Sequence, residues 1–362
     1  MKTPTPGQRH LERECQRAVR SQIQWMIEDG SFGPGLLIIS GWALRTEGIE
    51  ASEITFSVNS EPFTCVAYPL SSQDLTEIFW DIPDSQMARF QCAIPLETIF
   101  ARRGFYKLEL LQDGDTKTST QTAWYFPDPE IDLAVPDEKR IKRVIGVPDL
   151  NNFILGGATI FCRFDAYLKA RFGKSIADME RILDWGCGSG RIARYSSLIP
   201  CVDYWGVDID GDNVDWCRKN VPEGTFLTIP MSPITDLPAQ AFDLIIGISV
   251  FTHLDETAQF DWLHELRRVL KPDGIIMVSI QGNAQSGLYR TPESILQQVE
   301  LDGFSVIGKN EQLNDVFGNN NHYLNVVQSK QYIYEKWGEV FDIVDISEAL
   351  AANQDVVVMK KR

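Results

Sequence analysis

The spacing of apolar positions changes along the chain and divides it into regions of different texture. Apolar residues from about Gln8 to Ile27 recur at helical spacing and predict an N-terminal helix within residues 1–29. In residues 30–127, short β-branched or alternating runs are separated by turn residues, and helical spacing is rare. This pattern predicts an all-β, sandwich-like domain.

Five segments of this region have the composition of strands, namely residues 36–44, 54–58, 63–68, 105–110 and 120–125. The last two flank Asp113-Gly114, a dipeptide that favours a tight hairpin. Trp42 lies in an apolar run, which favours a place in the core over an exposed ring that stacks on sugars.

A different pattern begins after the prolines near residue 130. Proline lacks a backbone donor and restricts its neighbours, so residues 128–150 are predicted to be a linker. Helix and strand patterns then alternate over residues 151–362, with strands predicted at 181–185, 204–209, 242–250, 275–280, 340–346 and 355–360, and helices at 160–172, 191–198, 212–219 and 258–270. Continuous apolar strands that alternate with helices predict an α/β domain built on a parallel sheet covered on both faces.

The composition of the chain limits the classes of partner that it is expected to bind. The 362 residues carry a net charge of −16, which disfavours nucleic acids and anionic membrane surfaces, because both attract clustered Lys and Arg. No apolar run is long enough for a signal peptide or a membrane span. The seven cysteines form no C-x-x-C pair, so we expect free thiols, no metal site and a cytoplasmic protein. The sequence carries no signal for an oligomeric state.

The strongest chemical signal is Asp184-Trp185-Gly186-Cys187-Gly188-Ser189-Gly190, a glycine-rich turn between a predicted strand and a predicted helix. Glycines permit positive φ and close approach of a ligand, and a helix N-terminus offers unpaired amides. The spacing is G-x-G-x-G and differs from the G-x-G-x-x-G of dinucleotide sites. A carboxylate at Asp184 would repel a pyrophosphate but suits an ammonium group. S-adenosylmethionine has that group and no phosphate, so it is favoured over a nicotinamide dinucleotide.

Asp208 stands 18 residues after Gly190, at the end of the next predicted strand. An acidic residue at about this distance binds the ribose hydroxyls of a nucleotide cofactor. Alone, such an aspartate more often caps a helix; together with the glycine loop it favours the ribose interpretation.

Residues 181–280 resemble the core of class I S-adenosylmethionine-dependent methyltransferases. Four motifs carry the resemblance, in order along the chain: the Asp184–Gly190 loop, Gly206-Val207-Asp208, residues 241–254 and residues 263–274. Residues 241–254 span the fourth strand of the family's sheet and the residues just after it, and residues 263–274 precede the fifth strand of that sheet. It implies a Rossmann-like, seven-stranded sheet whose final strand inserts antiparallel. Two departures stand out: a Lys-Pro-Asp-Gly turn, and Pro230–Pro233 in place of the usual Asp-Ala pair that contacts adenine.

The predicted cofactor contacts follow from these motifs. They are Asp184, Gly186, Cys187, Gly188, Ser189, Gly190, Arg191, Asp208, Ile209, Met231, Ser232 and Ser249. Met231 would pack on the adenine ring. For Arg191 and Arg194 two alternatives stay open, namely contact with an acidic substrate and pairing with surface carboxylates.

Two histidines are candidate catalytic residues. His253 lies just past the fourth strand, at the sheet edge where ligands of α/β folds collect, and is a candidate base for a substrate hydroxyl. The alternative is a local polar role beside the next helix. His322 lies in a polar insert after the fifth strand, whereas His264 is expected on the surface.

The sequence thus predicts S-adenosylmethionine-dependent methyl transfer to a small molecule, with a sugar or glycan hydroxyl as the first acceptor. The alternatives are a non-catalytic binding or scaffold protein that retains the fold, and a nicotinamide oxidoreductase.

Overall fold

The computed structural model describes residues 14–362 apart from gaps at 16, 20–22, 34, 46–47, 49, 59, 80–81, 100–103, 113–114, 117–118, 120–122, 127–133, 198, 290 and 311–322. Contacts divide the described residues into two compact units. The smaller unit comprises residues within 19–132 and 150–159, and the larger comprises the rest.

The first sheet of the smaller unit is antiparallel, with strand order β1-β2-β6-β5. Its strands are β1 (Trp25–Gly33), β2 (Leu36–Ala43), β6 (Arg89–Pro95) and β5 (Cys65–Leu70). The predicted extension of the N-terminal helix to Ile27 is wrong. Helical residues are found at 14–15 and 17–19, but Trp25 and Ile27 alternate into the core at strand spacing, each 2% exposed.

The second sheet has the order β4-β3-β7-β8, with β9 also pairing to β7. Its strands are β4 (Glu61–Pro62), β3 (Ile54–Val58), β7 (Gly104–Gln112), β8 (Asp115–Thr116) and β9 (Ala123–Phe126). Asp113 and Gly114 lie outside the described residues, but the flanking β7 and β8 pair antiparallel.

Both sheets contribute to one core, in which Trp25, Phe56 and Phe90 are buried. Trp42 is 3% exposed, as expected of a core side chain. The short helical segments of this unit are η1 (Ala51–Glu53), α2 (Leu75–Ile78), η2 (Pro83–Met87) and α3 (Leu96–Ile99).

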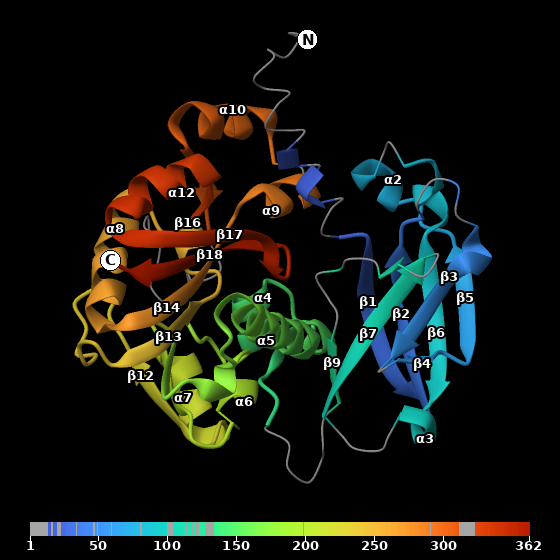
Figure 1. The fold of residues 1–362 in the computed structure, drawn as a ribbon, viewed down its shortest axis with the longest axis horizontal. Coiled ribbons are helices and arrows are strands. Elements are labelled where there is room, and N and C mark those ends of the chain that lie inside the picture. Colours follow the sequence, from blue (N-terminus) through green and yellow to red (C-terminus); the bar gives the residue numbers. More distant parts are fainter. Residues whose placement is uncertain are drawn as a thin grey trace. The chain divides into compact units, whose positions relative to one another are not determined.

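The larger unit is built on a seven-stranded sheet with the order β12-β11-β10-β13-β14-β18-β17 (Figure 1). Its strands are β10 (Arg181–Trp185), β11 (Asp203–Asp208), β12 (Gly224–Thr228), β13 (Phe242–Gly247), β14 (Leu270–Ile280), β17 (Phe341–Ala351) and β18 (Gln354–Lys361). The first five strands in this order are parallel, and β18 inserts antiparallel between β14 and β17. The predicted Rossmann-like sheet with an antiparallel final strand is confirmed.

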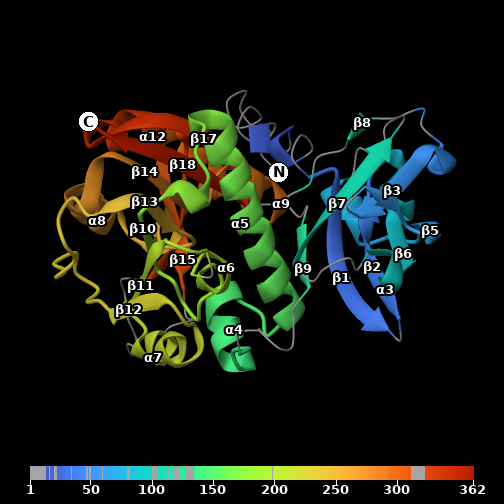
Figure 2. The ribbon, with the colours of Figure 1, turned by 60° about the horizontal axis from the view of Figure 1, so that its bottom comes forward.

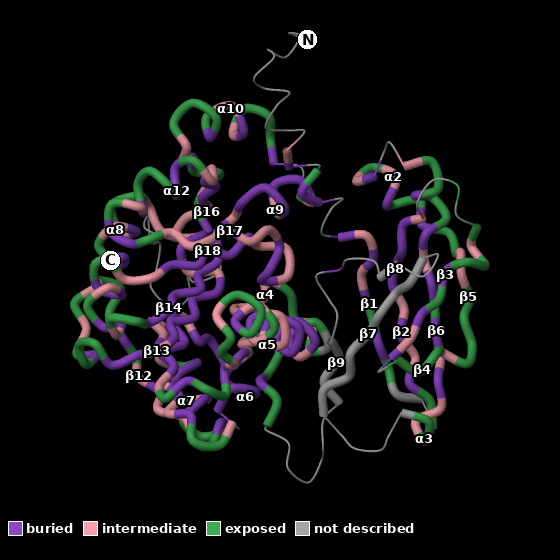
Figure 3. The backbone as a smooth tube through the Cα atoms, viewed as in Figure 1, coloured by how far each residue is buried: buried purple, intermediate pink, exposed green. Residues whose placement is uncertain are grey.

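Helices cover both faces of this sheet (Figure 2). Successive residues of β10 point to opposite faces, so Ile182 packs with α5 (Leu150–Phe172), α6 (Ala193–Ser196) and α7 (Gly211–Asn220). Leu183 packs on the other face with α8 (Glu256–Val269) and α12 (Lys330–Lys336). The central strands are therefore buried almost throughout, whereas the outer helices carry exposed residues (Figure 3).

Three segments of the larger unit differ from expectation. The predicted linker 128–150 contains a helix, α4 (Glu138–Ile145), because Asp137 accepts a hydrogen bond from the Arg140 amide at 3.0 Å and Gly146 ends the helix at φ 84°. The predicted helix 191–198 is only the four residues of α6. The predicted turn at Lys271–Gly274 belongs to β14, as an irregularity in its pairing with β13.

The remaining elements are η3 (Ile176–Asp178), η4 (Phe251–His253), α9 (Asn283–Leu288), α10 (Glu293–Asp302), β15 (Phe304–Lys309), β16 (Leu324–Gln328) and η5 (Trp337–Glu339). The strands β15 and β16 form an antiparallel pair, and they lie on either side, in sequence, of the polar segment that contains His322. Among the residues that the structure describes, no helix combines the length and the apolar character needed to cross a membrane.

Candidate cofactor and catalytic site

A cavity lies in the larger unit where β10, β11 and β13 end, which is the edge at which ligands of parallel sheets bind. Ten of the predicted site residues line it, namely Asp184, Gly186, Cys187, Gly188, Arg191, Asp208, Ile209, Met231, Ser249 and His253. Three others, Ser189, Gly190 and Ser232, are not in its wall, and His322 lies outside the described residues.

The glycine loop is held by its own backbone. Gly186, Gly188 and Gly190 have φ angles of 79°, 53° and 81°, a region that favours glycine. The amides of Gly186 and Cys187 both donate to the carbonyl of Val207, at 2.8 and 3.0 Å. These bonds tie the turn after β10 to the neighbouring strand β11 and fix the conformation of the loop.

Charges of both signs face the cavity beside this loop. Asp184 is 2% exposed and accepts a hydrogen bond from the hydroxyl of Tyr204. Burial raises the pKa of Asp184 to about 6, although the Tyr204 hydrogen bond and the charge of Arg191 act in the opposite direction. Burial also lowers the pKa of Arg191 to about 10, so it stays protonated at neutral pH. An anion and a cation side by side suit the two charged groups of an amino acid.

Asp208 ends β11 and uses both carboxylate oxygens locally. One oxygen accepts from the Gly188 amide at 2.7 Å, and the other accepts from the Asp210 amide at 2.8 Å. Burial raises its pKa to about 6. The cap of α7 is Asp210, which accepts from the amides of Asp212 and Asn213 at 3.0 and 3.4 Å. The capping role considered for Asp208 therefore belongs to Asp210.

Beyond Asp208 the wall becomes less polar. Ile209 and Met231 line it, and Met231 is 37% exposed. The side chain of Asn213 also faces this part of the cavity, and its buried Oδ1 has no hydrogen-bond partner among the described residues. A buried acceptor of this kind is suited to a donor on a ligand.

Ser249 lies just past β13 with a φ of 59°, an uncommon value for a non-glycine residue. Its amide donates to Ser279 Oγ at 2.8 Å, and its hydroxyl donates to Gln354 Oε1 at 3.0 Å. Strands β13, β14 and β18 thus hold the backbone of this cavity residue in a fixed conformation.

His253, on η4, is fixed by the β15–β16 pair. Its Nδ1 lies 2.8 Å from the carbonyl of Leu324, which can only accept, and 3.2 Å from the side-chain amide nitrogen of Asn310, which can only donate. The shorter carbonyl contact favours the tautomer with the proton on Nδ1 and the lone pair on Nε2. The Tyr323 ring packs on the imidazole with 4.4 Å between centroids. Burial lowers the pKa of His253 to about 4, so the ring is neutral at physiological pH.

Several cavity residues were not predicted from the sequence. Arg143 and Val144 come from α4 and Tyr323 from the residues before β16. The Asp137 and Gly146 cap signals could have revealed α4. Arg194, for which surface pairing was one alternative, is 4% exposed and buried, whereas His264 is exposed as expected. Within the described ranges, no cluster of three or more His, Cys, Asp or Glu side chains is arranged to hold a metal ion.

Comparison with known proteins agrees with this geometry. Residues 183–278 match the family described as "Methyltransferase domain". Over 112 residues, 31% of this chain and 29% of the relative, the sequence is 30% identical to the cyclopropane-fatty-acyl-phospholipid synthase of Escherichia coli K12. The chain thus spans less than a third of the length of this curated relative.

Solved methyltransferase structures are similar to part of this chain. A 1,6-didemethyltoxoflavin-N1-methyltransferase from Burkholderia thailandensis, solved with S-adenosylhomocysteine, is 16% identical with a TM-score of 0.41, covering 61% of this chain and 84% of that one. An S-adenosylmethionine-dependent methyltransferase from Mesorhizobium loti is 15% identical with a TM-score of 0.36, covering 50% and 90%.

The family match identifies residues 183–278 as a methyltransferase domain, and the strand order of the larger unit is the one that the resemblance to class I S-adenosylmethionine-dependent methyltransferases implies. The predicted family, fold class, enzyme class and cofactor are confirmed at this level.

Proposed function

We propose that this chain transfers the methyl group of S-adenosylmethionine to a hydroxyl of a small molecule, with a sugar or glycan as the first candidate acceptor. One observation carries the proposal: Asp184 and Asp208, at the ends of adjacent strands, face one cavity on either side of the glycine loop. The bound cofactor would supply an electrophilic methyl group on a sulfonium.

The donor fits the residues in a definite order. Asp184 would hold the α-ammonium group and Arg191 the carboxylate, since the two side chains bring opposite charges to the same end of the cavity. Asp208 would accept the ribose hydroxyls, for which a carboxylate has lone pairs beyond its two backbone bonds. Ile209 and Met231 would pack on the adenine, with Asn213 nearby as an acceptor.

His253 is our candidate for the proton acceptor. The Leu324 carbonyl keeps the proton on Nδ1, which leaves the lone pair of Nε2 for a hydroxyl. A pKa of about 4 makes it a weak base. This is sufficient, because the hydroxyl proton becomes strongly acidic as the oxygen gains the methyl group, and His253 would accept it at that stage. Alignment of the two reactants would provide most of the acceleration, on the order of 7–11 kcal/mol.

The acceptor class is argued from the net charge and from the β-rich unit. The net charge of −16 argues against an anionic lipid surface as substrate, even though the name of the E. coli relative refers to a phospholipid. It argues equally against nucleic acid. Trp42 offers no sugar platform because it is buried, so the sugar hypothesis depends on the β-rich unit as a whole. The seven free cysteines favour a reducing, cytoplasmic location.

Two measurements test the proposal. Calorimetric titration with S-adenosylmethionine and with NADH should show binding of the first only; absence of S-adenosylmethionine binding would overturn the proposal. Incubation with labelled donor and a panel of sugars and small alcohols should then release S-adenosylhomocysteine in an acceptor-dependent way. Binding without turnover on any acceptor would instead favour the scaffold alternative.

A further inference from the structure

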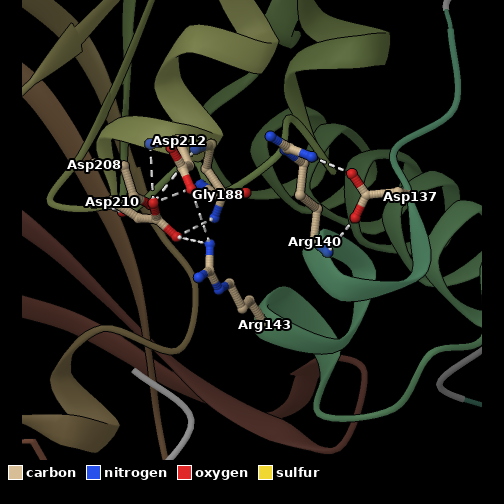
Figure 4. Close-up of polar contacts among 8 residues, drawn as sticks. Asp137, Arg140, Arg143, Gly188, Asp208, Asp210 and Asp212 are labelled. Atoms are coloured by element: carbon tan, nitrogen blue, oxygen red, sulfur yellow. Dashed lines mark hydrogen bonds and ion pairs between the residues drawn. The ribbon is translucent and has the colours of Figure 1, made fainter. Parts of the chain in front are cut away.

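Helix α4 contributes a buried cation to the cofactor cavity. Arg143 is 7% exposed, and its Nη1 lies 3.0 Å from Oδ2 of Asp210, which is 3% exposed, and 3.8 Å from Oδ2 of Asp212 (Figure 4). The next residue, Val144, lies against the glycine loop: a Cβ built on Gly188 would come within 2.6 Å of its Cγ2. Two consecutive residues of α4 therefore reach two parts of the cavity wall: Arg143 contacts Asp210, and Val144 lies against the glycine loop.

A second arginine on the same helix makes a different contact. Arg140 pairs with Asp137, the N-cap of α4 itself, and the two side chains are 27% and 51% exposed (Figure 4). This pair joins α4 only to itself, whereas Arg143–Asp210 joins α4 to the end of β11. Exposed pairs within one helix contribute little, but removal of one partner from a buried pair leaves an uncompensated charge.

Asp210 is directly linked to the predicted ribose contact. Its amide donates to Asp208 at 2.8 Å, and its negative charge acts to raise the pKa of Asp208. Its own carboxylate caps α7 and receives Arg143. The guanidinium thus neutralises the second carboxylate beside Asp208 and fixes the backbone segment that presents it.

We infer that α4 is a clasp on the cofactor pocket, closed by the Arg143–Asp210 pair, so that docking of α4 and binding of the cofactor stabilise each other. Arg143 is a positioning residue that acts through Asp210. The inference rests on the proposed function, since it assumes the donor in this cavity. Coupling of this kind is reciprocal: the factor by which docked α4 strengthens cofactor binding equals the factor by which bound cofactor favours the docking of α4.

The test compares Arg143→Ala with the matched control Arg140→Ala in the full chain, with S-adenosylhomocysteine as the probe. We expect Arg143→Ala to raise Kd by about tenfold, chiefly through a faster dissociation rate, because a looser clasp releases ligand more readily. Arg140→Ala should stay within about twofold of the wild type. Calorimetry gives Kd, and stopped-flow tryptophan fluorescence gives the rates, since Trp185 and Trp262 line the cavity.

Asp210→Asn provides an independent variant, because asparagine still caps α7 but lacks the charge. It should reproduce the effect of Arg143→Ala, and the double variant should be no weaker than the single ones. If both single variants bind the probe as tightly as Arg140→Ala does, the inference that the Arg143–Asp210 pair closes α4 on the pocket is wrong, whereas the proposed cofactor site is unaffected. If the wild type itself does not bind the probe, the proposed function fails first.

Discussion

The cofactor cavity has two walls that are built in different ways. The loop wall, formed by residues 184–190 and Asp208, is shaped by backbone: positive φ at glycines and amides bonded to Val207 and Asp208. The side-chain wall, formed by Arg143, Val144, His253 and Tyr323, is assembled from three distant segments by an ion pair, a ring contact and a hydrogen bond. The first wall suits recognition of an invariant donor, and the second suits closure and chemistry.

The largest expected effect is that of His253→Ala on kcat, and it distinguishes the role of the side-chain wall from that of the loop wall. His253→Ala should lower kcat by about 10²–10⁴-fold, because it removes the group that accepts the hydroxyl proton. Affinity for S-adenosylhomocysteine should stay within about threefold, since His253 is not among the proposed donor contacts. Steady-state kinetics together with calorimetry checks both; a large loss of affinity would place His253 with the donor instead.

Asp208→Ala should produce the opposite pattern. The carboxylate holds the Gly188 amide and is proposed to hold the ribose, so we expect affinity for S-adenosylhomocysteine to fall about a hundredfold, equivalent to two charged hydrogen bonds. Calorimetry on the folded variant, with its thermal midpoint as the control, measures the change. An unchanged Kd would remove Asp208 from the ribose site.

Gly188→Ala tests where the two walls meet. At φ 53° an alanine costs about 1–2 kcal/mol, and its Cβ would also clash with Val144. We therefore expect affinity to fall about tenfold or more, and Val144→Ala in the same chain to restore part of it by removing the clash. If the second substitution restores nothing, α4 does not press on the loop as the structure indicates.

Per ionisable group, the smallest effect is that of pH on donor affinity. Asp184 and Asp208 have raised pKa values of about 6, so both are ionised at pH 7.5 and become protonated as pH falls through 6. Binding that needs an ionised carboxylate should weaken by about fourfold per group between pH 7.5 and 5.5. His253, with a pKa of about 4, stays neutral over this range and adds no dependence. Asp208→Asn should lose one of the two contributions in a calorimetric pH series.

The same contrast explains what the sequence could predict. Glycine spacing, an acidic residue at a strand end and apolar strand runs are local, so the sheet, the loop and the position of Asp208 were accessible from sequence. Contacts such as Arg143–Asp210 join residues 67 positions apart, and no local pattern encodes them. The N-terminal helix was extended too far because Ile23 and Met26 fit helical spacing, whereas the core selects the strand alternation of Trp25 and Ile27. Propensity is a weak prior where tertiary packing decides.

Hydrogen exchange with and without saturating S-adenosylhomocysteine tests most directly whether both walls surround the donor. We predict that ligand slows exchange of the amides in residues 186–192, 208–213 and 138–145 together, while strands β1 and β2 of the smaller unit exchange unchanged. Protection of the loop without α4 would contradict the two-walled site. Protection elsewhere in the chain, with none at 186–192, would contradict the cofactor assignment altogether.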